Sequence, residues 1–171
     1  EALVEVDSVE VRLYRSAVES AHTLRVKLYR RGQPIPLTDC MPVLENMGVR
    51  VIEEHPFRVE PDGIAVWIHD FLLVDPNGDP IDLESIRADF EDAFERVWSG
   101  EAEDDGFNAL VIHAGLDWRE ITILRAYAKY LRQIAVPFSQ ELMARTLVNQ
   151  SAIAKYLVEF FAGRFDPAGV E

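Results

Sequence analysis

Two kinds of hydrophobic periodicity divide the chain. Residues 9–15 and 24–30 alternate between apolar and polar side chains, which is typical of strands with one buried face. Residues 49–59 and 64–74 continue the strand-like pattern, and the last of these, IAVWIHDFLLV, is the strongest strand candidate. Beyond residue 82 the apolar side chains recur every three to four residues, which indicates helices.

A short helix interrupts the strands. Thr38 or Asp39 is expected to cap it, and Gly48 suits a left-handed residue at its end. The order of two strands, a helix and two more strands predicts a small antiparallel sheet with a helix on one face. This is the α+β arrangement of ferredoxin-like and ACT-type regulatory domains. We therefore predict an α+β domain over residues 1–80 and a helical subdomain over residues 81–171.

Five helices are expected in the second part. Their predicted caps are Asp82, Asp104 or Asp105, Asp117, Ser139 and Ser151. Two of the helices meet at an elbow, where Gly115 suits a left-handed helix end. Asp117 and Glu120 then have the spacing of a capping box. The predicted core-facing positions of the last three helices are Ile121, Leu124, Ala128, Leu131, Leu142, Met143, Thr146, Leu147, Ile153, Leu157, Phe160 and Phe161.

The chain is acidic, with a formal net charge of −13. This charge argues against binding to nucleic acid or to an anionic membrane. Residues 82–105 hold ten acids and two arginines, and a solvated helix face is the favoured interpretation. Arg125, Lys129 and Arg132 share one helix face at i, i+4 and i+7 and form a candidate interface. We expect them to meet the acidic region rather than to bind a phosphate or carboxylate.

Motifs that carry chemistry are few. No glycines have the spacing of a nucleotide-binding loop and the four histidines are scattered, so neither a cofactor nor a metal is expected. Asp75, Asn77 and Asp79 mimic the first ligands of a calcium loop, but Pro80 replaces the glycine that such a loop needs. Cys40 is the only cysteine and is expected to be a buried small hydrophobe. The lack of a disulfide, of an apolar spanning segment and of a signal-peptide pattern predicts a cytoplasmic protein.

A candidate effector site lies at a loop and helix start beside the sheet, where ACT-type domains hold amino-acid effectors. It comprises Gly32, Gln33, Ile35 and Thr38. A second polar feature is the pair His69 and Asp70 in the fourth strand. Strand neighbours point to opposite faces, so they should not bond to each other, and one of them should hydrogen-bond across the sheet or at its end.

Long tracts of the sequence follow one another in a recognisable order. They are VKLYRRGQPIPLTDCMPVLENMGVRVIEEHPF, WIHDF, FEDAFERVWSGEAEDDGFNALVIHAGLDWREITILRAYAKYLRQ, and FSQ followed by FFAGRFDP. In wording and order they resemble the large bacterial NAD-specific glutamate dehydrogenases over residues 22–167.

The resemblance implies a parent enzyme that oxidatively deaminates L-glutamate to 2-oxoglutarate with NAD. The family's catalytic lysine and aspartate and its nucleotide-binding glycines have no matching positions here, so no catalytic residue is carried over. The chain resembles an ACT-like module plus a helical region that precede the catalytic part, which implies an architectural or regulatory role. Its expected partners are the remaining domains of the same polypeptide, further copies in a homo-oligomer and an amino-acid effector. The first residue, Glu1, is not a methionine, and we expect a piece of a longer protein.

Two other hypotheses stay open. The chain could be a stand-alone regulator that senses an amino acid at the candidate effector site. Alternatively, it could be a helical interaction module in which the acidic residues 82–105 meet a basic surface.

Overall fold

The computed structural model describes residues 8–165, and the predicted domain ends at residues 1–7 and 166–171 lie outside the described part. The first half contains β1 (Val9–Tyr14), β2 (Thr23–Arg31), α1 (Leu37–Asn46), β3 (Arg50–Val59), the 3-10 turn η1 (Pro61–Gly63) and β4 (Val66–Val74). The second half contains α2 (Leu83–Trp98), the 3-10 turn η2 (Gly106–Ala109), α3 (Leu110–Ala114), α4 (Trp118–Gln133), α5 (Gln140–Asn149) and α6 (Ser151–Phe165). The predicted α+β class and the five predicted helices are confirmed.

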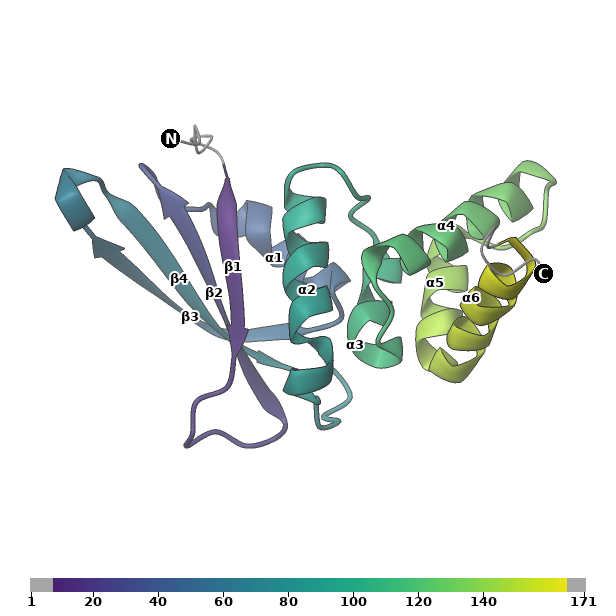
Figure 1. The fold of residues 1–171 in the computed structure, drawn as a ribbon, viewed down its shortest axis with the longest axis horizontal. Helices are drawn as coiled ribbons and strands as arrows, with labels where there is room; N and C mark the ends of the chain where they lie inside the picture. The colour runs from purple at the N-terminus through teal and green to yellow at the C-terminus, as the bar shows by residue number, and fades with distance from the viewer. Residues whose placement is uncertain (1–7, 166–171) are drawn as a thin grey trace.

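The four strands form one antiparallel sheet in the order β1-β2-β4-β3. Successive side chains on each strand point to opposite faces of the sheet. Val11, Val26 and Phe71 point to the inner face and are fully buried, while their strand neighbours are more exposed. Helices α1 and α2 lie against this inner face, and no helix formed by residues 8–165 covers the outer face (Figure 1).

Helix α2 connects the sheet to the helical part. Phe90 and Phe94 are fully buried, and the backbone N–H of Leu13 on β1 donates to the Glu91 carboxylate at 2.7 Å. The helix packs against β1 on one side and against α3 on another. It therefore forms part of the sheet's cover as well as the start of the helical part, and the division at residue 80 stays a prediction.

The elbow between α3 and α4 forms as predicted. Gly115 has φ 56°, in the left-handed region. The Asp117 carboxylate accepts from the Glu120 N–H and the Glu120 carboxylate accepts from the Asp117 N–H, which completes the capping box. The cap before α3 is Asp105, whose side chain accepts from the Phe107 N–H.

Two predicted caps are wrong. Helix α1 has Pro36 at its N-cap, and the Thr38 hydroxyl lies in the first turn and donates to the Asp39 carboxylate. The Pro36 ring holds φ at −62°, so the helix can begin one residue later without a side-chain cap. Ser151 is the first residue of α6, since the Gln150 carbonyl accepts the first helical hydrogen bonds.

The predicted core face of α6 is also wrong. Ala154 and Val158 are the buried residues of this helix, whereas Ile153, Leu157 and Phe160 are exposed. On α4 and α5 the outer predicted positions Leu131 and Leu142 are exposed as well, as is Thr146. Each of these helices keeps one row of side chains in the core and presents a second apolar row to solvent.

Candidate functional site

The candidate effector site lies between the end of β2 and the start of α1. Gly32 has φ 87°, and its N–H donates to the Ala65 carbonyl at 2.8 Å. Gln33 and Thr38 are exposed, whereas the Ile35 side chain belongs to the core. Binding of an effector by these residues stays a prediction.

A buried histidine holds this loop from the sheet side. The Ile35 N–H donates to Nε2 of His69 at 3.1 Å, and Nδ1 of His69 lies 2.8 Å from Oε1 of Glu54 on β3. Because Nε2 accepts a hydrogen bond, the proton of the neutral ring is on Nδ1 and is donated to the carboxylate. The predicted hydrogen bond across the sheet is thus confirmed, while its partner Glu54 could not be found without the strand register.

Asp70 faces the opposite side of the sheet, as expected from alternation. Its carboxylate accepts from the Tyr14 hydroxyl at 2.8 and 3.0 Å, and Arg25 lies 3.4 Å away. Burial, and then the bond to Asp70, raise the pKa of Tyr14 to about 12. Burial alone would raise the pKa of Glu19, but its hydrogen bond from Arg25 at 2.6 Å and its bond from the Ser16 N–H contribute to a net lowering.

Arg125 is the central polar residue of the helical part. Its side chain is 3% exposed and donates two hydrogen bonds to the Asp105 carboxylate, at 2.8 and 3.0 Å. It also donates to Oδ1 of Asn108 at 2.7 Å, and Gln140 on α5 donates to Asp105 at 2.9 Å. This cluster fixes η2, α4 and α5 relative to one another. Sequence spacing pointed to Arg125 but gave no signal for Asn108 or Gln140.

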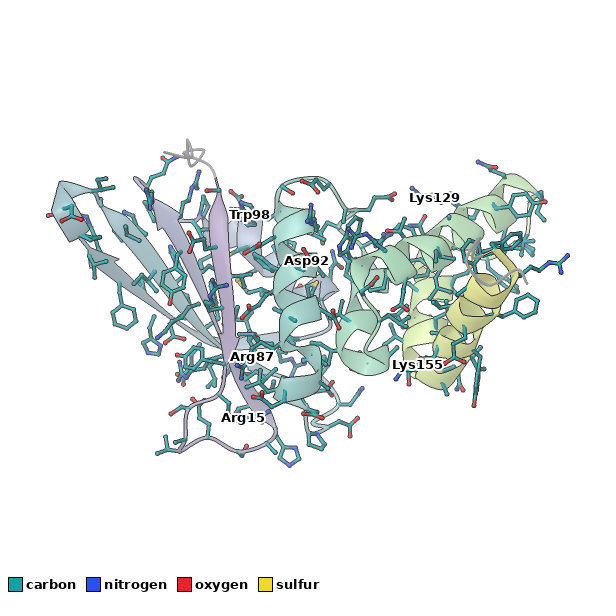
Figure 2. All side chains as sticks on the ribbon, viewed as in Figure 1. Arg15, Arg87, Asp92, Trp98, Lys129 and Lys155 are labelled. Atoms are coloured by element: carbon teal, nitrogen blue, oxygen red, sulfur yellow. The ribbon has the colours of Figure 1, made fainter. Side chains whose placement is uncertain are left out.

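The three predicted interface cations separate in the structure. Arg125 pairs with Asp105, and Lys129, labelled in Figure 2, pairs with Glu103, so both meet the acidic region as expected. Arg132 is exposed and forms no ion pair with another residue between 8 and 165. An interface role for the three residues stays a prediction.

An apolar groove of about 580 Å³ runs between α4, α5 and α6. We call it the α4–α6 groove, and its lining residues are Leu124, Tyr127, Ala128, Leu131, Phe138, Leu142, Met143, Thr146, Leu147, Leu157 and Phe160. Phe160 is 71% exposed and Phe138 is 54% exposed, which is unusual for phenylalanine. The sequence pattern predicts these positions as core, apart from Tyr127 and Phe138, so the groove itself is not predicted.

Two other residues that the sequence analysis considered for chemistry, Cys40 and Asp75, have structural roles. Cys40 is fully buried, and burial raises the pKa of its thiol to about 11, which confirms the predicted buried hydrophobe. The Asp75 carboxylate accepts from the N–H groups of Asn77 and Asp79, as a turn residue does. In the described part of the chain, no helix has the length and apolar character needed to cross a membrane.

These features define a class of protein: an ACT-like antiparallel sheet domain joined through a shared helix to a small helical domain. A family model described as glutamate dehydrogenase, ACT3 domain, matches residues 8–86. A second, described as glutamate dehydrogenase, helical motif 3, matches residues 102–167. The chain therefore belongs to the family of glutamate dehydrogenases that these two models describe.

Three relatives are NAD-specific glutamate dehydrogenases. The chain is 47% identical over 156 residues to the enzyme of Halomonas elongata, 38% identical over 165 residues to that of Pseudomonas aeruginosa and 34% identical over 171 residues to that of Mycobacterium tuberculosis. The alignments cover 91%, 96% and 96% of this chain but only 10% of each relative.

Proposed function

We propose that the chain is a non-catalytic architectural and regulatory segment of an NAD-dependent glutamate dehydrogenase. The parent enzyme converts L-glutamate, NAD and water to 2-oxoglutarate, ammonia and NADH. The observation that carries this proposal is the pair of family domains, which occupy residues 8–86 and 102–167 of a chain that spans a tenth of its relatives' length.

The polar clusters support an architectural role. Arg125 and His69 are only 3% and 4% exposed, and their hydrogen bonds end on residues of the same chain. A buried Arg with a bidentate carboxylate partner fixes distance and angle between elements. The segment thus serves as a rigid spacer that places neighbouring parts of the dehydrogenase polypeptide or joins its subunits.

Two measurements test this function. The purified 171-residue chain should form no NADH from L-glutamate and NAD, and formation of NADH by the chain alone would refute the proposal. In a full-length dehydrogenase that carries this chain, deletion of residues 8–165 should change subunit assembly as measured by sedimentation. An enzyme with unchanged assembly and unchanged regulation after the deletion would exclude the architectural role.

A second candidate function is amino-acid sensing at the candidate effector site. Helix α1 begins at Leu37 without a side-chain cap, and the Asp39 N–H donates to the Pro36 carbonyl, so the N–H groups of Leu37 and Thr38 are the ones available to a ligand carboxylate. Titration calorimetry of the chain against the twenty amino acids tests this function. Binding should be lost when Gly32 is changed to Val, and heats no larger than dilution for every amino acid would exclude it.

A further inference from the structure

The α4–α6 groove has the properties of a docking surface. Helices α4, α5 and α6 form the end of the molecule away from the sheet (Figure 1). Their second apolar row is contiguous, since residues from all three helices and from the α4–α5 connection line the same groove. Contiguous exposed apolar surface of this kind marks interaction sites more often than isolated apolar residues do.

The charges beside the groove are positive. Arg164 follows Leu157 and Phe160 at i+7 and i+4, so it lies on the groove-facing side of α6. Arg132 follows Ala128 at i+4 and flanks the groove on α4. Both side chains are exposed, and neither forms an ion pair with any other residue from 8 to 165.

The acids of these helices lie elsewhere. Glu141 lies one and two positions before Leu142 and Met143, and Glu159 lies two positions after Leu157 and one before Phe160. At about 100° per residue, both acids point to the side of their helix opposite the lining residues. Glu120, the remaining acid, is held in the capping box of α4. Residues 118–165 contain seven Lys or Arg and three Glu, in contrast to the acidic chain as a whole. A complementary occupant is therefore apolar on one side and acidic on the other.

The described part of this chain cannot supply such an occupant. Helix α2 is acidic and amphipathic, but its apolar residues Ile86, Phe90 and Phe94 are buried beneath the sheet. The relatives, in contrast, contain about ten times the length that this chain spans.

We propose that the α4–α6 groove binds an amphipathic helix with an acidic polar face, supplied by another part of the dehydrogenase polypeptide. This inference rests on the proposed function. The helix places side chains at i, i+3 or i+4 and i+7 between Leu131, Leu142 and Phe160, as in other helix-in-groove complexes. Its acids reach Arg132 and Arg164 at the two flanks.

The methionines allow a direct test. The chain has three, of which Met143 lines the groove, Met47 is fully buried in the core, and Met41 lies on α1. The chain is labelled with ¹³C at the methionine methyl groups. It is then titrated with overlapping peptides of about 20 residues, or roughly five to six helical turns, that tile the rest of the Halomonas elongata enzyme. We expect peptides with an acidic amphipathic pattern to shift Met143 and to leave Met47 unchanged.

Matched variants assign the binding to the groove. Phe160→Glu should weaken the peptide about tenfold or more, whereas Phe165→Glu should have a clearly smaller effect, because Phe165 packs against Phe161 beside a separate hollow. These two phenylalanines lie on the same helix and are 71% and 57% exposed, so the folding cost of the two changes is comparable. The double change Arg132→Glu and Arg164→Glu should weaken the acidic peptide, and the equal charge change at Arg145 and Lys155 should have a smaller effect. Lys155 approaches Gly115 at the end of α3, and Arg145 lines a separate hollow beside η2.

The following results would overturn the inference. The groove has a different occupant if no peptide shifts Met143, if basic peptides bind as well as acidic ones, or if Phe160→Glu binds normally. If the chain without peptide is a dimer that Phe160→Glu converts to a monomer, the occupant is a second copy. These results would leave the architectural role standing, because that role is tested by the assembly of the full-length enzyme.

Discussion

At the scale of single residues, neighbours on β4 serve opposite sides of the sheet. His69 joins Glu54 to the Ile35 backbone on the helix-covered side, while Asp70 joins Tyr14 and Arg25 on the open side. A shift of the β4 register by one residue would exchange these two environments. It would bring a carboxylate under the helices and leave His69 without its acceptor and donor. The pair therefore helps to specify the register of the central strand.

Replacement of Tyr14 by Phe should remove one late phenol titration. The folded pKa of Tyr14, about 12, exceeds the ordinary value of 10.0. The protonated phenol therefore contributes its full stabilisation of the fold below pH 10, and this contribution is lost as the pH rises toward 12. Ultraviolet titration of the five tyrosines should show this late step in the wild type and in Tyr156→Phe, where the phenol is exposed. A late step of unchanged size in Tyr14→Phe would contradict the assignment.

At the scale of elements, α4 has two adjacent buried side chains, one in an apolar and one in a polar environment. Leu124 is 3% exposed and packs in the apolar core, and Arg125 points into the polar cluster around Asp105. The capping box at Asp117 sets where the helix begins, and hence which residues face each environment. The helix can therefore be tested separately for its apolar and its polar contacts.

Arg125→Met should destabilise the fold by about 3–5 kcal/mol, because Asp105 and Asn108 lose a buried charged partner. Lys129→Met, one turn further along the same helix, removes an exposed pair and should cost about 0–1 kcal/mol. Urea denaturation of the two variants measures both values. Similar losses for the two variants would mean that the Arg125 cluster adds no more than a surface ion pair.

Leu124→Ala should cost about 2–5 kcal/mol as a core truncation. Leu131→Ala is its control, since Leu131 lines the same groove but is 36% exposed. Its loss should be clearly smaller in thermal or urea unfolding. A cost for Leu124→Ala of less than about 0.5 kcal/mol would show that this side of α4 is not part of the core.

Local hydrogen bonding explains which elements could be predicted from the sequence. The caps Asp117 and Ser139 depend on atoms within three residues, and the strands follow from alternation, so short patterns were sufficient. The position of α2 on the sheet could not be predicted, because an amphipathic stripe does not identify the surface it faces. For the same reason the sequence pattern predicts Leu157 and Phe160 as core, whereas the buried row of α6 consists of the smaller residues Ala154 and Val158.

At the scale of the whole molecule, one hydrophobic core continues from the sheet into the helices. Among the glycines that the structure describes, Gly48, just after α1, has the tightest surroundings: an added Cβ would lie 2.9 Å from the Cβ of Ala109 in η2. Gly48 also has φ 85°, a conformation that side chains with a Cβ rarely adopt. This position requires glycine for both its backbone angle and its space.

Gly48→Ala should therefore cost more than Gly32→Ala. Gly32 has a similar φ of 87°, but no atom lies within 4 Å of its added Cβ, so only the strain of about 1–2 kcal/mol applies. At Gly48 the contact with Ala109 should add about 1–3 kcal/mol. Thermal unfolding of both variants, together with His113 shifts by NMR, measures the difference, since His113 also lies 3.2 Å from the added Cβ. Equal losses of stability in the two variants would show that the contact between position 48 and Ala109 can relax without an energetic cost.

The shared helix α2 also governs how such a protein could be recombined with its relatives. A chimera joined just before Leu83 would separate Phe90 and Phe94 from the strands that they cover, and would unpair Glu91 from the edge of β1. A crossover in the exposed stretch from Ser99 to Glu101 would take α2 and the sheet from the same parent, so the contacts between them would be unchanged. In library construction, exchange of the helical half should therefore be tolerated best when the splice follows Trp98, the last residue of α2.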